Sequence, residues 1–257
     1  MGGALASGRI EPVVTPLAAL VAPNARGGLA WIAMGFFSKH GLDQRRELMV
    51  RTQLANRGIR DESVLAVMGA VPRHEFVPEY LRQDAYEDHP LPIGEEQTIS
   101  QPYIVAAMLG HLALRPKDRV LEVGTGSGYV TALLSVLCAE VFSVERYPSL
   151  ATSAETTLER LGYRNVKIRI GDGIEGWSEH APYDAVLVSA ATAEVPPPLF
   201  DQLAEGGRMI IPVGPPMSQE LQLIRKVNGQ SEVTLLEGCR FVPLVEGPVE
   251  EKSGRDG

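Results

Sequence analysis

The chain has 257 residues, of which 44% are hydrophobic, and its 24 basic and 32 acidic residues give a formal net charge of −8 at pH 7. Proteins that coat nucleic acids present a basic stripe, so this acidic balance argues against a nucleic-acid partner. No run approaches the roughly 18 consecutive apolar residues of a membrane span, so we expect no membrane partner either.

Residues 1–41 are predicted to form a weakly structured N-terminal extension. Prolines and glycines interrupt this segment and its two apolar patches, Leu17–Val21 and Leu29–Phe37. A signal peptide has a basic start and an unbroken apolar core, whereas Arg9 is followed closely by Glu11. We therefore expect no secretory signal in this segment.

Between residues 42 and 115 the pattern predicts helices joined by irregular segments. Helices are expected at Leu42–Arg57, Asp61–Ala70 and Tyr103–Leu114. Residues 73–94 are rich in proline and aromatic residues, and we expect them to pack over the core without regular structure. Residues 97–102 are predicted to form a polar loop.

From residue 116 to residue 246 strand and helix patterns alternate. Strands are predicted at Arg119–Val123, Glu140–Glu145, Val166–Ile170, Ala185–Ser189, Arg208–Val213, Leu221–Val227 and Glu232–Val242. Helices are predicted at Tyr129–Leu137, Ser149–Leu161 and Pro197–Leu203. The alternation implies parallel pairing, and the last two strands, which have no helix between them, imply an antiparallel edge. We predict one domain over residues 42–246, an α/β fold with a doubly wound, seven-stranded, mostly parallel sheet, followed by a disordered tail over residues 247–257.

The two cysteines, Cys138 and Cys239, are far apart, and the five histidines are scattered. Neither cysteine has a partner at C-x-x-C spacing, so we predict no metal site. Free cysteines suit a reducing compartment, and we expect a cytoplasmic protein. The sequence is silent on the oligomeric state, and we take a monomer as the expectation.

The segment Val120–Gly128 is the strongest indication of a ligand site. An apolar strand ends in three alternate glycines and a helix follows at once, which places a ligand at the carboxyl end of a strand. The spacing is G-x-G-x-G, whereas dinucleotide-binding enzymes use G-x-G-x-x-G. Glu122 is a poor neighbour for a pyrophosphate and a good one for a cation. The motif therefore favours S-adenosylmethionine (SAM), which carries a sulfonium and an ammonium, over a redox dinucleotide, which remains the rival.

Two more acids follow the next strands of the predicted sheet. Glu145 lies 21 residues after Gly124, and an acid about 20 residues beyond the glycines is the one expected on ribose hydroxyls. Asp172 stands in a Gly-Asp-Gly turn and is predicted to accept from the adenine amino group. Glu122 is predicted to turn toward the methionine ammonium. The full set predicted to bind the cofactor is Glu122, Gly124, Thr125, Gly126, Ser127, Glu145, Arg146, Asp172 and Gly173.

A resemblance to a known family covers about residues 42–247. The segments that carry it are Val71–Val77, Leu91–Ala106, Val120–Gly128, Ser143–Arg146, Gly171–Gly173, Leu203–Pro212 and Arg240–Leu244. Together they resemble protein-L-isoaspartate O-methyltransferases, with Gln97-Thr98-Ile99-Ser100-Gln101-Pro102 as the most specific part. The glycine loop by itself is shared by many methyltransferases.

The resemblance implies repair of damaged proteins. Such an enzyme methylates the α-carboxylate of an L-isoaspartyl residue with SAM, and the ester then closes to a succinimide that hydrolyses partly to normal aspartate. The partners implied are isoaspartyl-containing peptides and proteins. The family's active-site serine corresponds to Ser100, and the residues expected to bind the substrate are Thr98, Ile99, Ser100, Phe241 and Val242.

Other interpretations stay open at this level. Ser100 precedes a predicted helix and is also a candidate N-cap. The strand that contains Phe241 and Val242 is either a peptide-binding sheet edge or an ordinary core strand. The protein as a whole is alternatively a SAM-dependent methyltransferase with another acceptor, or a SAM-binding scaffold without turnover, because a fold does not define a function.

Overall fold

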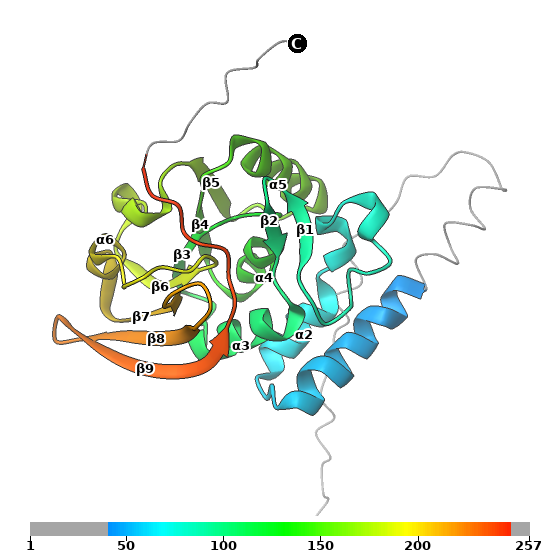
Figure 1. Ribbon diagram of the computed structural model, residues 1–257, viewed down its shortest axis with the longest axis horizontal. Coiled ribbons are helices and arrows are strands. Elements are labelled where there is room, and N and C mark those ends of the chain that lie inside the picture. Colours follow the sequence, from blue (N-terminus) through cyan, green and yellow to red (C-terminus); the bar gives the residue numbers. More distant parts are fainter. Residues whose placement is uncertain (1–40, 248–257) are drawn as a thin grey trace, which may run out of the picture. The chain divides into compact units, whose positions relative to one another are not determined.

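A seven-stranded sheet with the strand order β5-β4-β3-β6-β7-β8-β9 is the centre of the computed structural model, which describes residues 41–247 (Figure 1). Its strands are β3 (Arg119–Val123), β4 (Glu140–Glu145), β5 (Val166–Ile170), β6 (Tyr183–Val188), β7 (Leu203–Val213), β8 (Gln219–Val227) and β9 (Gln230–Cys239). Strands β3 to β7 are parallel, and β8 pairs antiparallel with both β7 and β9. The predicted sheet and its antiparallel edge are confirmed.

The helices that the structure describes in full are α2 (Glu62–Ala70), α3 (Pro102–Leu112), α4 (Tyr129–Leu137), α5 (Pro148–Leu161) and α6 (Pro197–Asp201). Ahead of them, residues 41–48 are helical, and the chain continues through a π-helical segment, Met49–Leu54, and a 3-10 turn, Ala55–Arg57. The Asp61 side chain caps α2 by accepting from the backbone N–H groups of Ser63 and Val64.

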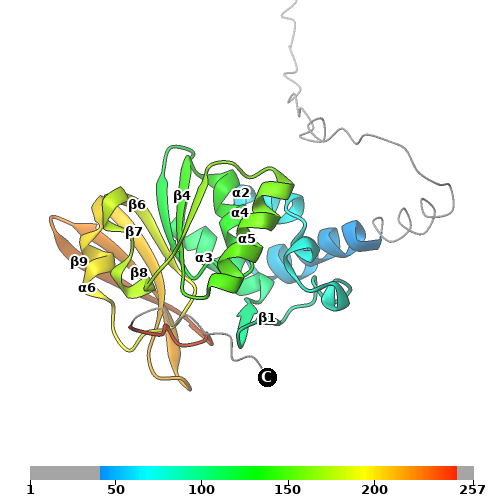
Figure 2. The same cartoon turned by 90° about the horizontal axis from the view of Figure 1, so that it is seen from above.

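The central strands are buried on both faces, which explains their continuous apolar sequences. Side chains of β3 alternate between two cores: Val120 packs with α2, α3 and α4, whereas Leu121 and Val123 pack with α6 and residues 173–181. The larger helices therefore gather on one side of the sheet, with α6 on the other (Figure 2).

The predicted polar loop over residues 97–102 is wrong in its first half. Residues Gln97–Ile99 form strand β2, which pairs antiparallel with β1 (Leu91–Gly94). The turn between them places Glu95 and Glu96 at φ values of 49° and 58°. Tight hairpin turns with two positive φ values usually contain Asn or Gly at those positions. Here glutamates occupy them, so the sequence carries no turn signal.

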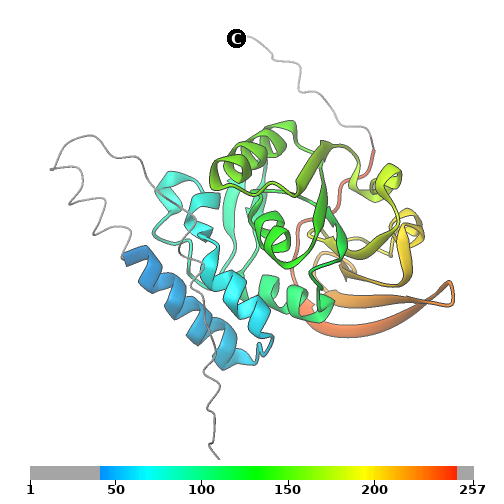
Figure 3. The same ribbon diagram turned by 180° about the vertical axis from the view of Figure 1, so that it is seen from behind.

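The predicted last strand is also too long at its end. Strand β9 stops at Cys239, and residues 241–247, called the strap below, leave the sheet edge. In Figure 1 the strap is the red segment that runs back across the carboxyl ends of the central strands. The buried Gln219 side chain causes the departure, because its amide donates to the Phe241 carbonyl (3.1 Å) and accepts from the Phe241 N–H (2.6 Å). Seen from behind, the β8–β9 hairpin projects from the domain (Figure 3).

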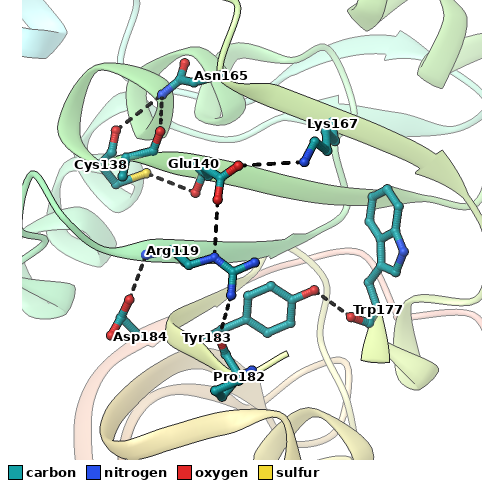
Figure 4. A network of polar contacts seen from close by, with 10 residues as sticks. Arg119, Cys138, Glu140, Asn165, Lys167, Trp177, Pro182, Tyr183 and Asp184 are labelled. Carbon is teal, nitrogen blue, oxygen red and sulfur yellow. Dashed lines mark hydrogen bonds and ion pairs between the residues drawn. The ribbon is translucent and has the colours of Figure 1, made fainter. Parts of the chain in front are cut away.

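A polar network ties the strands together at their amino ends, opposite the glycine loop (Figure 4). The Arg119 backbone N–H donates to Asp184 (2.8 Å), and its guanidinium donates to Glu140 (3.3 Å) and to the Pro182 carbonyl (3.2 Å). Lys167 of β5 lies 3.7 Å from Glu140. These contacts join β3, β4, β5 and β6, so the carboxyl ends project from a braced sheet.

Residues 1–40 of the predicted extension and residues 248–257 of the predicted tail lie outside the described residues, whereas Gly41 is helical. Gly247 is described, and it is held by Arg146 and Asp172. Within residues 41–247 no helix is long and apolar enough to cross a membrane, and no cluster of three or more His, Cys, Asp or Glu side chains is arranged to hold a metal ion.

Candidate active site

Two hollows meet at the carboxyl ends of the central strands. The first, called the glycine-loop cavity, is lined by the loop after β3, the start of the segment after β4, Gly173, β2 and the strap. The second, called the outer groove, lies between the β2–α3 loop and the far ends of β8 and β9. Four residues line both hollows: Thr98, Ser100, Ser189 and Val242.

The meeting point coincides with the place where the strand order reverses. The chain runs outward from β3 through β4 to β5 and then returns to β6 on the other side of β3. Gly124 N–H donates to the Val144 carbonyl, and Ser189 N–H donates to the Val123 carbonyl, each at 2.9 Å. Open α/β sheets bind ligands in the crevice outside such a switch point.

The glycine loop has a shape that only glycines hold without strain. Gly124, Gly126 and Gly128 have φ values of 91°, 54° and 84°, in the region that residues with a Cβ atom seldom adopt. A Cβ on Gly126 would lie 3.3 Å from Ile93 Cδ1, and one on Gly128 would lie 3.2 Å from Ala154 Cβ. The loop therefore brings its backbone close both to its neighbours and to the cavity.

Glu145 is in the position predicted for it. Its carboxylate lines the glycine-loop cavity, with Oε2 accepting from the Gly126 N–H (2.7 Å) and Oε1 from the Tyr147 N–H (2.9 Å). Burial raises the pKa of this carboxyl above its ordinary value, although the backbone donors act in the opposite direction. The side chain thus fixes the glycine loop and retains lone pairs for a ligand with hydroxyl groups.

Glu122 lies behind the glycine loop rather than at the cavity wall. Its side chain is fully buried and does not line the glycine-loop cavity; Oε2 accepts from the hydroxyls of Thr131 (2.6 Å) and Ser143 (2.7 Å). Burial raises the pKa of the Glu122 carboxyl to about 8. Strand alternation directs this side chain into the interior, so any contact with the methionine ammonium stays a prediction and would require the side chain to leave these partners.

Arg146 and Asp172 contact the strap. Arg146 lines the cavity, and its guanidinium donates to the carbonyls of Val245 (3.3 Å) and Gly247 (2.8 Å). Asp172 does not line the cavity: it accepts from the Ile174 N–H (3.0 Å) and the Gly247 N–H (2.8 Å). Asp172 thus caps the turn and holds the strap, and its neighbour Gly173 lines the cavity, while the adenine contact stays a prediction.

Other predicted cofactor residues divide in a similar way. Gly124, Gly126 and Ser127 line the cavity. Thr125 lines it as well, but its hydroxyl lies 2.5 Å from the Ser143 hydroxyl and so faces the buried Glu122 network. The part of Thr125 that faces the cavity is therefore its backbone.

Ser100 is held in place through its backbone. Its carbonyl accepts from the guanidinium of Arg73 (2.8 Å), a fully buried side chain that also donates to the Ala85 carbonyl (2.7 Å). Burial lowers the pKa of Arg73 to about 10, so the group is still charged at neutral pH. The Ser100 hydroxyl makes no hydrogen bond within residues 41–247, and the cap of α3 is Gln101, without a side-chain cap bond. The N-cap interpretation of Ser100 is therefore wrong.

The remaining predicted substrate residues border one or both hollows. Thr98 lines both, Ile99 lines the glycine-loop cavity and Phe241 lines the outer groove. The backbone groups of Phe241 are taken by Gln219, and the Val242 carbonyl accepts from Ala191 N–H (2.8 Å). These groups are therefore not a free sheet edge for a peptide.

The sequence did not predict that Ser189 borders both hollows, that Gln219 turns the chain, or that Arg146 binds the strap. Ser189 was assigned only as the end of a strand; its position at the switch point becomes visible once the strand order is known. Gln219 gives no sequence signal, since it binds a backbone 22 residues away.

Comparisons with known proteins agree with this geometry. Residues 44–249 match the family described as protein-L-isoaspartate(D-aspartate) O-methyltransferase. The chain is 55% identical over 204 residues to a protein-L-isoaspartate O-methyltransferase of Koribacter versatilis, covering 79% of this chain and 91% of that one. It is 54% identical over 200 residues to protein-L-isoaspartate O-methyltransferase 1 of Syntrophobacter fumaroxidans, covering 78% and 94%.

Solved structures give the same result. One of a protein-L-isoaspartate O-methyltransferase superposes with a TM-score of 0.72 at 33% identity, covering 79% of this chain and 67% of that chain. A second, described as a putative protein-L-isoaspartate O-methyltransferase of Plasmodium falciparum in complex with S-adenosyl-L-homocysteine, gives a TM-score of 0.70 at 30% identity, covering 79% of this chain and 99% of that chain.

Proposed function

This chain belongs to the protein-L-isoaspartate O-methyltransferase family, and we propose from the site that it transfers the methyl group of SAM to the α-carboxylate of L-isoaspartyl residues in damaged proteins. The resulting ester closes to a succinimide, which starts the repair. The observation that carries this proposal is the meeting of a glycine-loop cavity and an open groove at Ser100.

The glycine-loop cavity fits SAM. Gly124 and Gly126 have no Cβ atom, so a ligand can approach the backbone of the loop closely. The Glu145 carboxylate lines the cavity and can accept from the two ribose hydroxyls. Ser127, Gly173 and the aliphatic part of Arg146 complete the wall. Asp172 accepts from the N–H groups of Ile174 and Gly247, and we expect its remaining lone pairs to accept from the adenine amino group. When bound, SAM supplies an electrophilic methyl group on a sulfonium.

The outer groove fits a peptide. It is open, and it joins the inner cavity where Thr98, Ser100 and Val242 line both. Ser100 is the residue we propose as catalytic: its hydroxyl holds one oxygen of the acceptor carboxylate while the other attacks. Thr98, Ile99, Phe241 and Val242 bind the surrounding peptide.

The chemistry needs no general base. An α-carboxylate is ionised at pH 7 and is already a nucleophile. The protein therefore contributes alignment of the attacking oxygen with the methyl group and removal of water from the carboxylate. The backbone contact between Arg73 and Ser100 serves alignment, because it fixes the serine from inside the core. The strap over the cavity excludes solvent.

The alternative is a methyltransferase of the same class with a different acceptor. A matched pair of peptides, identical except for an isoaspartyl or an aspartyl residue, separates the two. We expect methyl transfer from labelled SAM to the isoaspartyl peptide only. Equal rates on both peptides would contradict isoaspartyl repair and leave a methyltransferase, whereas binding of SAM without transfer to any aged protein would indicate a scaffold.

We also propose that the protein is a cytoplasmic monomer without nucleic-acid or membrane partners. The supporting observations are two unpaired cysteines, Cys138 buried and Cys239 half-buried, and the net charge of −8. Light scattering of the purified chain and fractionation of cells test this, and a dimer mass or a membrane-bound fraction would contradict it.

A further inference from the structure

Three of the four residues that line both hollows carry a hydroxyl group: Thr98, Ser100 and Ser189. Thr98 and Ser100 come from β2 and the loop behind it. Ser189 comes from a separate element, because it follows the last residue of β6 in the sheet. The passage between cavity and groove is thus bordered by hydroxyls from two independent parts of the fold.

We propose that Ser189 is a second substrate-binding residue, whose hydroxyl donates a hydrogen bond to the acceptor α-carboxylate together with Ser100. This inference rests on the proposed function and deepens it. It assigns to the end of β6 a role that the loop resemblance does not contain.

The position of Ser189 is rigid. Its N–H donates to the Val123 carbonyl (2.9 Å), and two residues later Ala191 exchanges backbone hydrogen bonds with Val242 and Leu244 of the strap, each at 2.8 Å. A Cβ placed on Gly124 would lie 3.4 Å from Ser189 Cβ. The serine therefore sits against the first glycine of the loop, on the sheet side of the passage.

The Ser189 hydroxyl is also available. It makes no hydrogen bond to any residue in the part of the chain that the structure describes, and it is not closed off from the hollows that the residue lines. By contrast, the Ser149 hydroxyl donates a hydrogen bond to Glu95, and the Ser143 hydroxyl donates one to Glu122. A small polar side chain at a strand end that braces nothing in the protein is suited to a ligand.

The chemistry of the acceptor gives this hydroxyl a task. A carboxylate stripped of water needs donors to replace its hydration, and it has two oxygens with about four lone-pair directions. One hydroxyl fixes a single oxygen and leaves the carboxylate free to rotate about that bond. A second donor from another wall fixes the plane of the group, and this sets the direction of attack on the methyl carbon.

The test compares Ser189→Ala and Ser189→Thr with Ser231→Ala, a matched serine exposed on the β8–β9 hairpin. Steady-state rates are measured on the isoaspartyl peptide, and the affinity for S-adenosylhomocysteine is measured by calorimetry. We expect Ser189→Ala to lower kcat/KM by about 10- to 100-fold, the loss of one hydrogen bond to a charged group, with cofactor affinity within about 2-fold. We expect Ser189→Thr, which keeps the hydroxyl, to recover most of the rate, and Ser231→Ala to match the wild type.

The outcomes separate this inference from the proposed function. If the wild type does not distinguish isoaspartyl from aspartyl peptides, the proposed function fails before Ser189 is examined. If the wild type does and Ser189→Ala keeps its kcat/KM, only the role of Ser189 is overturned. An equal loss of cofactor affinity, or no recovery in a folded Ser189→Thr protein with intact cofactor binding, overturns it as well.

Discussion

The Ser143 hydroxyl donates a hydrogen bond to Glu122 at 2.7 Å, inside the core and directly behind the glycine loop. The same hydroxyl lies 2.5 Å from that of Thr125, a loop residue. Glu122 Oε1 is buried without a hydrogen-bond partner among residues 41–247. A carboxyl group in this setting supports the loop from behind, and its pKa of about 8 keeps it largely protonated at neutral pH.

Glu122→Gln should make the protein more stable at alkaline pH. Below about pH 4.5 the wild-type carboxyl is neutral in both the folded and the unfolded chain. Between pH 4.5 and pH 8 only the unfolded chain releases the proton, so the free energy of unfolding falls as the pH rises and levels off above pH 8. Glutamine removes this fall. We expect Tm values within about 3 °C at pH 5 and a variant about 10 °C more stable at pH 9.

The matched control for Glu122→Gln is Glu155→Gln on the exposed face of α5. Its Tm difference from the wild type should not change with pH. A constant difference for Glu122→Gln across the same range would mean that the folded carboxyl is ionised, in contradiction to its burial.

Ser100→Ala should slow methyl transfer far more than it weakens cofactor binding. The hydroxyl contributes one hydrogen bond to a charged acceptor, about 1.5–3 kcal/mol, so kcat/KM on an isoaspartyl peptide should fall about 10- to 150-fold. Calorimetry with S-adenosylhomocysteine should give a nearly unchanged Kd. An equal loss of cofactor affinity would contradict this prediction, because it would mean that the Ser100 hydroxyl binds the cofactor and not the acceptor carboxylate.

Glu145→Ala should show the reverse pattern. The change removes the expected ribose acceptor and also the acceptor of the Gly126 and Tyr147 N–H groups, so the glycine loop loses its anchor. We expect the Kd of S-adenosylhomocysteine to rise about 100-fold or more, as for the loss of charge-assisted hydrogen bonds. At saturating SAM much of kcat should return. A kcat that stays low at saturation would assign Glu145 to the transfer step.

Arg146→Ala should loosen the strap. The guanidinium holds the carbonyls of Val245 and Gly247, and ordinary hydrogen bonds contribute about 1 kcal/mol each. We expect S-adenosylhomocysteine to dissociate about 5- to 30-fold faster, together with faster hydrogen exchange at the strap amides. Arg164→Ala, an exposed arginine at the start of the β5 segment, is the control. Unchanged exchange in Arg146→Ala would show that Asp172 and Ala191 hold the strap without it.

The parts of the fold that sequence predicted well are those where one local pattern decides the outcome. Strands β3, β4 and β5 and helix α4 begin and end where periodicity placed them. The failures lie where a distant residue decides. The hydrogen bonds of Gln219 turn the chain away from the sheet at Phe241. Glu122 is buried because side chains alternate along β3, whereas the glycine motif suggested a side chain at the open end of that strand. Ser189 needed the strand order, which local pattern does not contain.

The strap has a consequence for how the protein is made. The glycine loop and Glu145 are synthesised about a hundred residues before Val245 and Gly247, which close the same cavity. Strands β3 to β7 have therefore all been synthesised before the residues that close the cavity. Affinity for SAM should therefore arise only after Gly247 has been synthesised and has reached the cavity, so shorter nascent chains would not bind the methyl donor.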